Sequence, residues 1–482
     1  MIRAADFARR DAASLWFLGA LMLPIAAAFS LRYALPGRTD RLVDIGQLSN
    51  YSHAGFAGYA LGMAGSFALY LAALRHCRRL PVGSALPAVF VVGACLTVTF
   101  AFMYPVNAID PFIYVARSRV LTAHGANPQT TAPAAFPDDP AMALASPEWA
   151  VAVSPYGPLW NSIAAPITLL AGNNEGVALA GFKALAALAT LTGGWSIVLV
   201  TRERAPKQAA TAALAYLWNP LVLWEGVGNG HNDVVLALAL LLAMLAWARR
   251  RDAAAIGWLS AATAIKYVAL PLGPPALAAL WRRGGSNRIR ALVVAVACAV
   301  LVGIVSLAPF FDLPGVIASA RAQSDIALTS PAAIAIAWLE GPLGLDAARS
   351  AMRATSAVLL GIGVIVGTAA AWRAPDRFPR IAFETMSLLL VVAVWNFRPW
   401  YLIWPLALAA VLPPGWPLRR AIAWTAGGAA FYGVTIWVWT WSDATWAVIQ
   451  PMATLVVFAP MLLVSLIAVI AEARGAARRP VH

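Results

Sequence analysis

Apolar runs of about 20 residues recur along the whole chain, and each is long enough to cross a lipid bilayer as a helix. Charged residues make up 12% of the 482 residues, whereas a soluble globular protein carries about 25%. The chain has too few charged residues to cover the surface of a soluble protein. The uninterrupted runs also exclude an outer-membrane barrel, whose strands alternate apolar and polar residues. The sequence therefore predicts an all-α polytopic membrane protein, with residues 1–482 forming one transmembrane domain.

The basic residues indicate how the chain is oriented. Most of the 35 Lys and Arg residues lie in short clusters between the apolar runs, which mark the cytoplasmic side by the positive-inside rule. The clusters fall near residues 3–10, 75–79, 202–207, 249–251, 282–290, 373–380, 419–420 and 474–479. Orientation in a membrane, rather than nucleic-acid binding, accounts for the net charge of +14. We expect a multi-pass protein of the cytoplasmic (inner) membrane, with both termini in the cytoplasm and no nucleic-acid partner.

This orientation divides the chain into about 12 transmembrane helices. They are expected near residues 12–33, 53–74, 82–104, 177–200, 208–227, 233–249, 291–310, 352–372, 380–396, 399–414, 420–440 and 447–471. Segment 253–281 starts and ends at basic clusters but is too short to cross twice, so we expect a broken, short or re-entrant hairpin there. Segment 156–172 should lie in the outer interface, or enter the membrane and return to the same side. Two periplasmic loops remain, 105–176 and 311–351.

The first periplasmic loop opens with Asp110 followed by Pro111. Asp before Pro at the start of a helical pattern is typical of an N-cap, so one interpretation gives Asp110 a capping role. Residues 111–123 then carry an apolar stripe together with Arg117 and Arg119, which suits a helix lying in the bilayer interface. The other interpretation makes Asp110 a general base beside a phosphate site formed with these arginines.

The loop continues with turn-forming residues and rigid aromatics, in Gly-Ala-Asn-Pro at 125–128 and Ser-Pro-Tyr-Gly-Pro-Leu at 154–159. These motifs predict a folded lid. The alternative is that their aromatic faces stack against a sugar. Asn127 and Tyr156 are the candidate substrate contacts in this part of the loop.

A second polar segment lies where one predicted helix ends and the next begins. It contains Glu225, His231, Asn232 and Asp233 within nine residues. Asn232 or Asp233 could simply cap the following helix. The group could instead orient a sugar, or bind a divalent cation together with other ligands. A divalent cation is therefore the one candidate cofactor, and its ligands are left open.

Two cations complete the candidate site. Lys266 lies roughly 20 Å of helix beyond the nearest basic cluster, too deep to reach the cytoplasm easily, so it is either functional or paired with a carboxylate. Arg398, in a tight turn with Trp400 and Tyr401, is a phosphate binder by its chemistry, although the aromatics equally suit an interfacial belt. Lys183 is expected to extend outward along its helix toward water.

Several short motifs, taken in order, carry a resemblance to a known family. They are Asp-Pro-x-x-Tyr at 110–114, Gly-x-Asn-Pro at 125–128, Ser-Pro-Tyr-Gly-Pro-Leu at 154–159, Asn-Pro-Leu at 219–221, His-Asn-Asp at 231–233, Ile-Lys-Tyr at 265–267 and Arg-Pro-Trp-Tyr at 398–401. Over roughly residues 80–410 the chain resembles the polytopic GT-C glycosyltransferases, especially the polyprenol-phosphate-mannose-dependent alpha-mannosyltransferases of actinobacteria.

The resemblance implies a glycosyltransferase that moves a mannose-like hexose, with inversion, from a polyprenyl-phosphate donor to a glycan or lipid acceptor on the periplasmic face. The family's catalytic acid maps onto Asp110. Candidates to hold the donor phosphate are Arg117, Lys266 and Arg398. Substrate contacts are expected from Tyr114, Asn127, Tyr156, Glu225, His231, Asn232, Asp233, Trp400 and Tyr401.

Two other functions fit the same composition. A flippase for a polyprenyl-linked sugar would also have many spans, a buried Lys and a broken hairpin. A transferase of the same fold could instead modify a lipid, as an aminoarabinose transferase does. Against the flippase, the chain has no internal repeat, and its acidic and aromatic residues gather in the outer loops.

The predicted orientation can be tested with reporter fusions. Alkaline phosphatase joined after Asn127 should be active because that site is expected in the periplasm, and a fusion after Arg251 should be inactive. An active fusion in the Arg249–Arg251 loop would overturn the orientation.

Overall fold

The computed structural model describes residues 2–35, 51–310 and 326–477, together with residues 312, 314, 315, 317 and 318. Apart from one isolated bridge between Ala34 and Met103, the regular elements in these ranges are helices, so the all-α prediction is confirmed. Much of 311–325, at the start of the second predicted loop, lies outside the described residues.

Eight helices in the described ranges are long and apolar enough to cross a membrane. They lie in α1 (Ile2–Arg32), α3 (His53–Cys77), α4 (Val82–Ala101), α8 (Glu175–Arg204), α13 (Arg288–Leu307), α16 (Leu345–Arg373), α19 (Trp416–Tyr432) and α21 (Trp446–Ala477). A ninth span results if the π-helical turn η5 (Val222–Gly228) and α10 (Asp233–Ala248), bent by 111°, are counted together. The other predicted spans fall on shorter helices, α9 (Ala209–Leu217), α17 (Phe378–Val392) and α18 (Ile403–Ala410).

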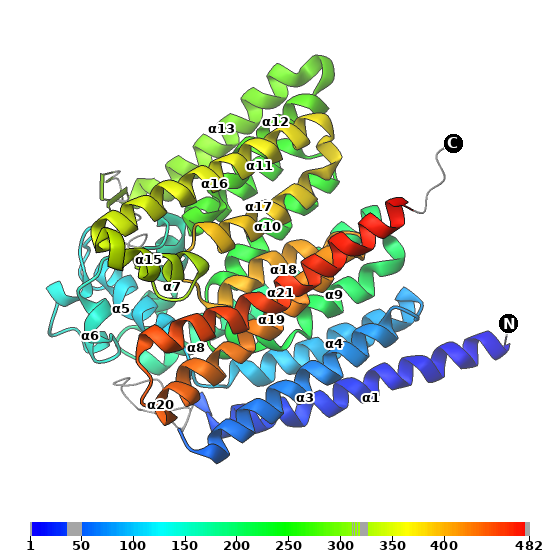
Figure 1. The fold of residues 1–482 in the computed structure, drawn as a ribbon, viewed down its shortest axis with the longest axis horizontal. Helices are drawn as coiled ribbons and strands as arrows, with labels where there is room; N and C mark the ends of the chain where they lie inside the picture. The colour runs from blue at the N-terminus through cyan, green and yellow to red at the C-terminus, as the bar shows by residue number, and fades with distance from the viewer. Residues whose placement is uncertain are drawn as a thin grey trace.

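The long helices pack around a centre made of the shorter ones (Figure 1). Every residue of α9 and of α18 is buried. By contrast, only 11% of the most apolar stretch of α13 and 17% of that of α16 is buried. Because the exposed residues of these two helices are largely apolar, α13 and α16 form a rim suited to contact lipid tails.

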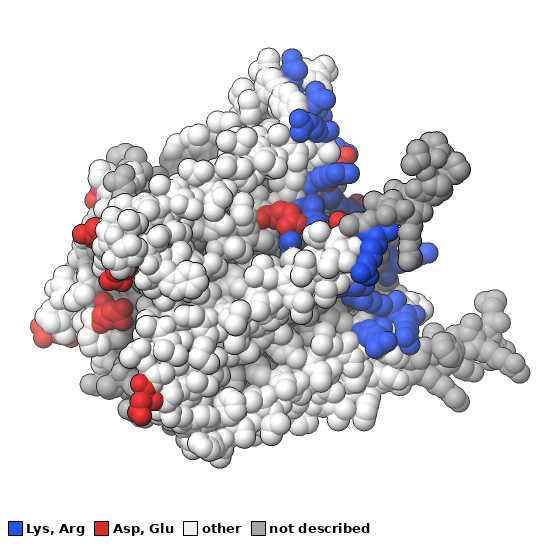
Figure 2. Space-filling model, viewed as in Figure 1, with Lys and Arg blue, Asp and Glu red and all other residues white. Residues whose placement is uncertain are grey.

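Charge separates along the bundle. On the face drawn in Figure 2, Lys and Arg gather at the end where both termini emerge, and Asp and Glu lie mainly at the opposite end. The acidic end carries the short helices α5 (Asp110–Thr122), α6 (Pro147–Ala150), α7 (Pro158–Ala171) and α15 (Pro331–Leu343). The two ends therefore have the opposite charge character that the sequence pattern requires of the two membrane surfaces.

Helix α5 is enclosed by protein. Each residue from Pro111 to Val120 is buried, so the helix has no lipid-facing side and is not the amphipathic surface element that its sequence suggested. The loop also contains the short 3-10 helices η2 (Pro133–Ala135) and η3 (Pro140–Ala143). These elements and α7 surround α5.

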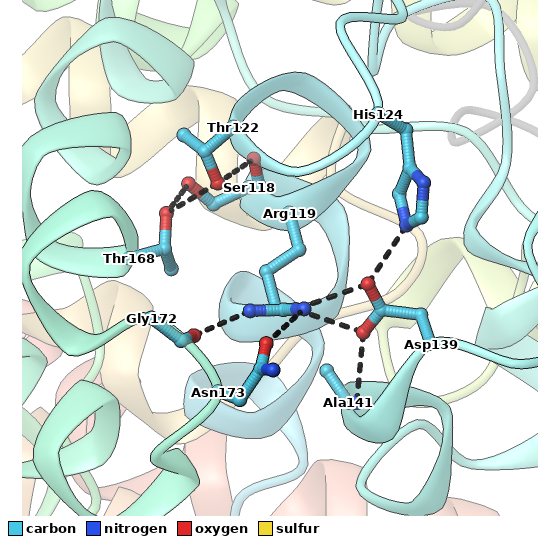
Figure 3. A network of polar contacts seen from close by, with 9 residues as sticks. All are labelled: Ser118, Arg119, Thr122, His124, Asp139, Ala141, Thr168, Gly172 and Asn173. Atoms are coloured by element: carbon cyan, nitrogen blue, oxygen red, sulfur yellow. Dashed lines mark hydrogen bonds and ion pairs between the residues drawn. The ribbon is translucent and has the colours of Figure 1, made fainter.

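Arg119 fixes this loop rather than facing the candidate site (Figure 3). Its Nε donates to Asp139 Oδ1 at 2.8 Å, its Nη2 donates to Asn173 Oδ1 at 2.9 Å, and Nη1 donates to the Gly172 carbonyl. His124 Nε2 lies 2.8 Å from the other Asp139 oxygen. Burial would raise the pKa of Asp139, but the hydrogen bonds from Arg119, Ala141 and His124 outweigh it and hold that pKa below its ordinary value.

Lys183 does not extend toward water as its position suggested. Its side chain is 1% exposed, and Nζ donates to the carbonyls of Phe100 at 3.1 Å, Met103 at 2.6 Å and Gly228. Three acceptors satisfy the three donors of an ammonium group. The residue therefore ties the end of α4 to the end of η5.

Segment 252–283 folds as two helices that meet at an interruption. Helix α11 (Asp252–Ile265) ends at Lys266, whose backbone is extended, and the 3-10 helix η6 (Tyr267–Leu272) leads into α12 (Gly273–Arg283). The far ends lie together, because Arg283 Nη1 donates to Asp252 Oδ1 at 3.1 Å. Lys266 is thus at the apex.

The first loop docks directly on this apex. The Gly157 amide, just before α7, donates to the Ile265 carbonyl at 2.9 Å. A Cβ atom at Gly157 would lie 2.1 Å from the Ala264 carbonyl oxygen, which is closer than any side chain can approach. The glycine is therefore required by close approach of two backbones.

Gly157→Ala should separate the loop from the apex. We expect the free energy of unfolding to fall by about 1–3 kcal/mol, the usual cost of overpacking. The loss would be measured as a lower melting temperature in detergent. Gly83→Ala is the control, because a Cβ there meets nothing within 4 Å. Equal melting temperatures for the two variants would show that the docking contact does not exist.

Candidate functional site

Asp110 is directed at two tyrosines. It is the first residue of α5, and Ile109 occupies the N-cap position, so the structure does not support a capping role. The Tyr156 hydroxyl donates to Asp110 Oδ1 at 2.6 Å, and the Tyr114 hydroxyl lies 3.5 Å from the same oxygen. The tyrosines hold the carboxylate in one orientation.

The surroundings of the partly buried Asp110 carboxylate favour its charged form. Burial by itself would raise the pKa of Asp110. The charge of His231 and the Tyr156 hydrogen bond oppose this effect, and so do the charges of Lys266 and Arg398. Together they hold the pKa of Asp110 below its ordinary value. An ionised carboxylate at neutral pH is the form that can accept a proton.

His231 lies between two carboxylates. Its Nε2 is 3.3 Å from Glu225 Oε2, and its Nδ1 is 3.9 Å from Asp110 Oδ2. The ring is fully buried and stacks on Trp400 with 3.8 Å between centroids. Gly230, with φ of +74°, lets the chain turn sharply enough to place the imidazole there, since residues with a Cβ rarely adopt that angle.

Asn229 supports this arrangement and was not among the predicted site residues. Its Nδ2 donates to Glu225 Oε2 at 2.9 Å, while its Oδ1 accepts from the amides of Val106 and Asn107. An amide side chain gives little sequence signal for chemistry. The position of Asn229 beside the acidic and imidazole groups of the same turn is the signal that could have identified it.

Lys266 is paired with Asp233. Lys266 Nζ donates to Asp233 Oδ2 at 2.7 Å, and the Asp233 side chain is fully buried. The ammonium also lies over the rings of Tyr156 at 5.6 Å, Tyr401 at 5.4 Å and Trp404 at 5.6 Å, within the range of cation–π attraction. Of the two interpretations offered by the sequence, the carboxylate pair is present, and it lies within the candidate site.

The two arginines approach the site from different elements. Arg117, on α5, is 4% exposed; its Nε is 3.4 Å from the Ala152 carbonyl, and its Nη2 has no hydrogen-bond partner among the described residues. Arg398 lies over the Trp400 ring at 5.9 Å.

The remaining predicted contacts divide into two groups. The Tyr114 hydroxyl accepts from the Asn232 backbone amide at 3.3 Å. This bond ties α5 to the turn at residues 229–232, called here the His231 turn. The Asn127 side chain instead accepts from the Gln129 amide within a local turn. Gln129, which the sequence analysis missed, donates to the Tyr156 carbonyl at 3.0 Å and to the Tyr267 hydroxyl at 3.3 Å.

Buried polar atoms without a protein partner gather at this site. Among the described residues they include Arg117 Nη2, His231 Nδ1, both side-chain polar atoms of Asn232, and Asp233 Oδ1. Buried polar groups are normally hydrogen-bonded. Donors and acceptors in this mixture suit a ligand rich in hydroxyl and phosphate oxygens. In the described part of the chain, no group of three or more His, Cys, Asp or Glu side chains is placed to hold a metal ion.

Comparisons with known proteins agree with one another. The family model for the N-terminal domain of alpha-(1->6)-mannopyranosyltransferase matches residues 15–283, more than half of the chain. Alpha-(1->6)-mannopyranosyltransferase A of Mycobacterium tuberculosis is 27% identical over 355 residues, which are 69% of this chain and 65% of that protein. Alpha-(1->6)-mannopyranosyltransferase B of Corynebacterium glutamicum is 26% identical over 282 residues, 55% of this chain and 43% of that protein. The aligned part is thus under two thirds of either relative.

The Lys266–Asp233 pair gives a testable prediction. Lys266→Met leaves a buried carboxylate without its partner and should cost about 3–5 kcal/mol of stability. Adding Asp233→Asn removes that charge, so the double variant should regain most of the loss in melting temperature. If the two changes instead destabilise additively, the residues are not a pair.

Proposed function

The chain belongs to the alpha-(1->6)-mannopyranosyltransferase family, and from this premise we propose that it is a membrane mannosyltransferase. The donor is a polyprenyl-phosphate-linked, mannose-like hexose, and the acceptor is a hydroxyl of a glycan or lipid. The observation that carries the proposal is the Asp110 carboxylate, held by the Tyr156 hydroxyl beside buried polar atoms that have no hydrogen-bond partner among the described residues.

The reaction is a single inverting displacement. The acceptor hydroxyl oxygen forms a bond to the anomeric carbon, and the bond from that carbon to the phosphate oxygen breaks. The electron pair leaves with the polyprenyl phosphate, and Asp110 takes the hydroxyl proton. The Tyr156 hydrogen bond directs one carboxylate oxygen, so that the other, facing His231, is available for the proton.

Arg117 is the best-supported ligand for the donor phosphate. Its Nη2 is buried and has no partner among the described residues, so a phosphate oxygen would satisfy it. Arg398 adds a second positive charge from the 398–401 turn. Lys266 already donates to the Asp233 carboxylate, so in this proposal it shapes the site and favours the charged form of Asp110 rather than binding phosphate alone.

The sugar is placed against the His231 turn. The Asn232 side-chain amide can both donate to and accept from sugar hydroxyls, and its two polar atoms are buried with no hydrogen-bond partner among the described residues. Trp400 and Tyr401 supply aromatic surface at the same end. Glu225 and His231 complete the wall, with His231 fixed by the Trp400 stack.

The proposal also assigns the two faces. The basic end, with both termini, is placed in the cytoplasm, and the acidic end with α5 is placed in the periplasm of a cytoplasmic-membrane protein (Figure 2). The segregation of charge supports this assignment.

Asp110→Asn tests the base. The amide oxygen can still accept from Tyr156, so folding and thermal stability should be kept, but the amide cannot take a proton. Transfer from polyprenyl-phosphate mannose should fall about 10²–10⁴-fold, the usual contribution of a general base. Asp138→Asn is the matched control, because Asp138 is exposed in the same loop. Wild-type rates for Asp110→Asn would remove the catalytic assignment.

A further inference from the structure

An apolar groove opens beside the hairpin apex. It has a volume of about 350 Å³ and lies between α11, η6, α12 and the lipid-facing helix α13. Such a volume is at the small end of ligand pockets. On α13 the lining residues include Val296, Ala299, Gly303 and Leu307, which share one helix face by their spacing.

The groove offers almost nothing to a polar ligand. Its serine and threonine hydroxyls are each satisfied by their own helix: Ser260 donates to the Ile256 carbonyl, Thr263 to that of Leu259, and Ser306 to that of Val302. Most of the other lining residues are aliphatic. An occupant would therefore gain from burying hydrocarbon and would find no free side-chain hydroxyl among these three to bind.

One end of the groove meets the candidate site. Pro158 and Tyr267 line it, and both adjoin residues already placed there. The Tyr267 hydroxyl accepts from Gln129, which also donates to the carbonyl of Tyr156, the tyrosine bonded to Asp110. Lys266 directly precedes Tyr267 and lies over the Tyr156 ring. From there the groove extends along α11 toward Ile256.

We propose that this groove binds the head-proximal isoprene units of the donor's polyprenyl chain, an assignment that rests on the proposed function. The polar site and the apolar groove lie side by side, which suits an amphiphile. Its phosphate would lie by Arg117 and Arg398, and its hydrocarbon would enter between α11 and α13. The groove's size limits it to the first units of a long chain, and the rest extends past the exposed face of α13 into the bilayer.

Two glycines make the groove testable without disturbing the protein. Gly273 and Gly303 both line it, and a Cβ at either meets nothing within 4 Å. The Cβ of Gly303→Leu therefore meets no neighbour, and the rest of the side chain takes up space in the groove. Gly361→Leu on α16 is the matched control, because Gly361 has the same open surroundings but does not line the groove.

The probes are decaprenyl phosphate and dimethylallyl phosphate, with affinities measured for the full chain in phospholipid nanodiscs. Gly303→Leu should weaken decaprenyl phosphate binding about tenfold, the effect of losing roughly two buried methylene groups. It should leave binding of the one-unit dimethylallyl phosphate unchanged. Gly361→Leu should match the wild type with both probes, and Gly273→Leu should behave like Gly303→Leu.

Equal decaprenyl phosphate affinity in Gly303→Leu and wild type would overturn the groove assignment. So would a loss of melting temperature and of co-purified phospholipid with no change in prenyl-phosphate binding, because the occupant would then be a structural phospholipid. Binding and transfer are scored separately. A wild type that binds by chain length but transfers no sugar would defeat the proposed function while supporting the groove.

Discussion

The cost of burying charge in an apolar bundle governs this site. Asp233 is fully buried at the start of α10, and it is stable there because Lys266 reaches it from the hairpin apex. The same ammonium lies over Tyr156 and Tyr401, so one ion pair draws together the first loop, the His231 turn and the 398–401 turn. Because the hairpin is interrupted at Lys266, the ammonium group lies within reach of Asp233.

Asp110 acquires its character from residues far away in the sequence. Burial would favour its neutral form, whereas the surrounding cations and the Tyr156 hydroxyl favour the carboxylate. The Nδ1 atom of His231 lies 3.9 Å from Asp110 Oδ2, and its Nε2 atom lies 3.3 Å from Glu225 Oε2. This balance favours a charged, oriented carboxylate next to buried polar atoms, and one end of the apolar groove adjoins the same site.

Sequence reasoning predicted the helical architecture and several polar residues that the fold brings close together. Lys266 was predicted because an ionisable group inside a membrane is costly without a purpose. Asp110 was predicted from its place beside two arginines at the membrane edge, and His231 and Asp233 from an unusually polar turn. Their partners were not foreseeable. Lys183 is held by three backbone carbonyls, which have no sequence pattern. Helix α5 seemed amphipathic because Arg119 is charged, but Asp139 and Asn173, distant along the loop, cover it.

Product analysis in detergent tests the central claim most directly. Purified protein would be incubated with polyprenyl-phosphate mannose and a panel of glycan and lipid acceptors, and the products identified by mass spectrometry. The account predicts a new hexosylated acceptor together with free polyprenyl phosphate, with no membrane present. If no acceptor is glycosylated, yet the protein moves the intact lipid-linked sugar between the leaflets of sealed vesicles, the protein is a transporter and the account is wrong.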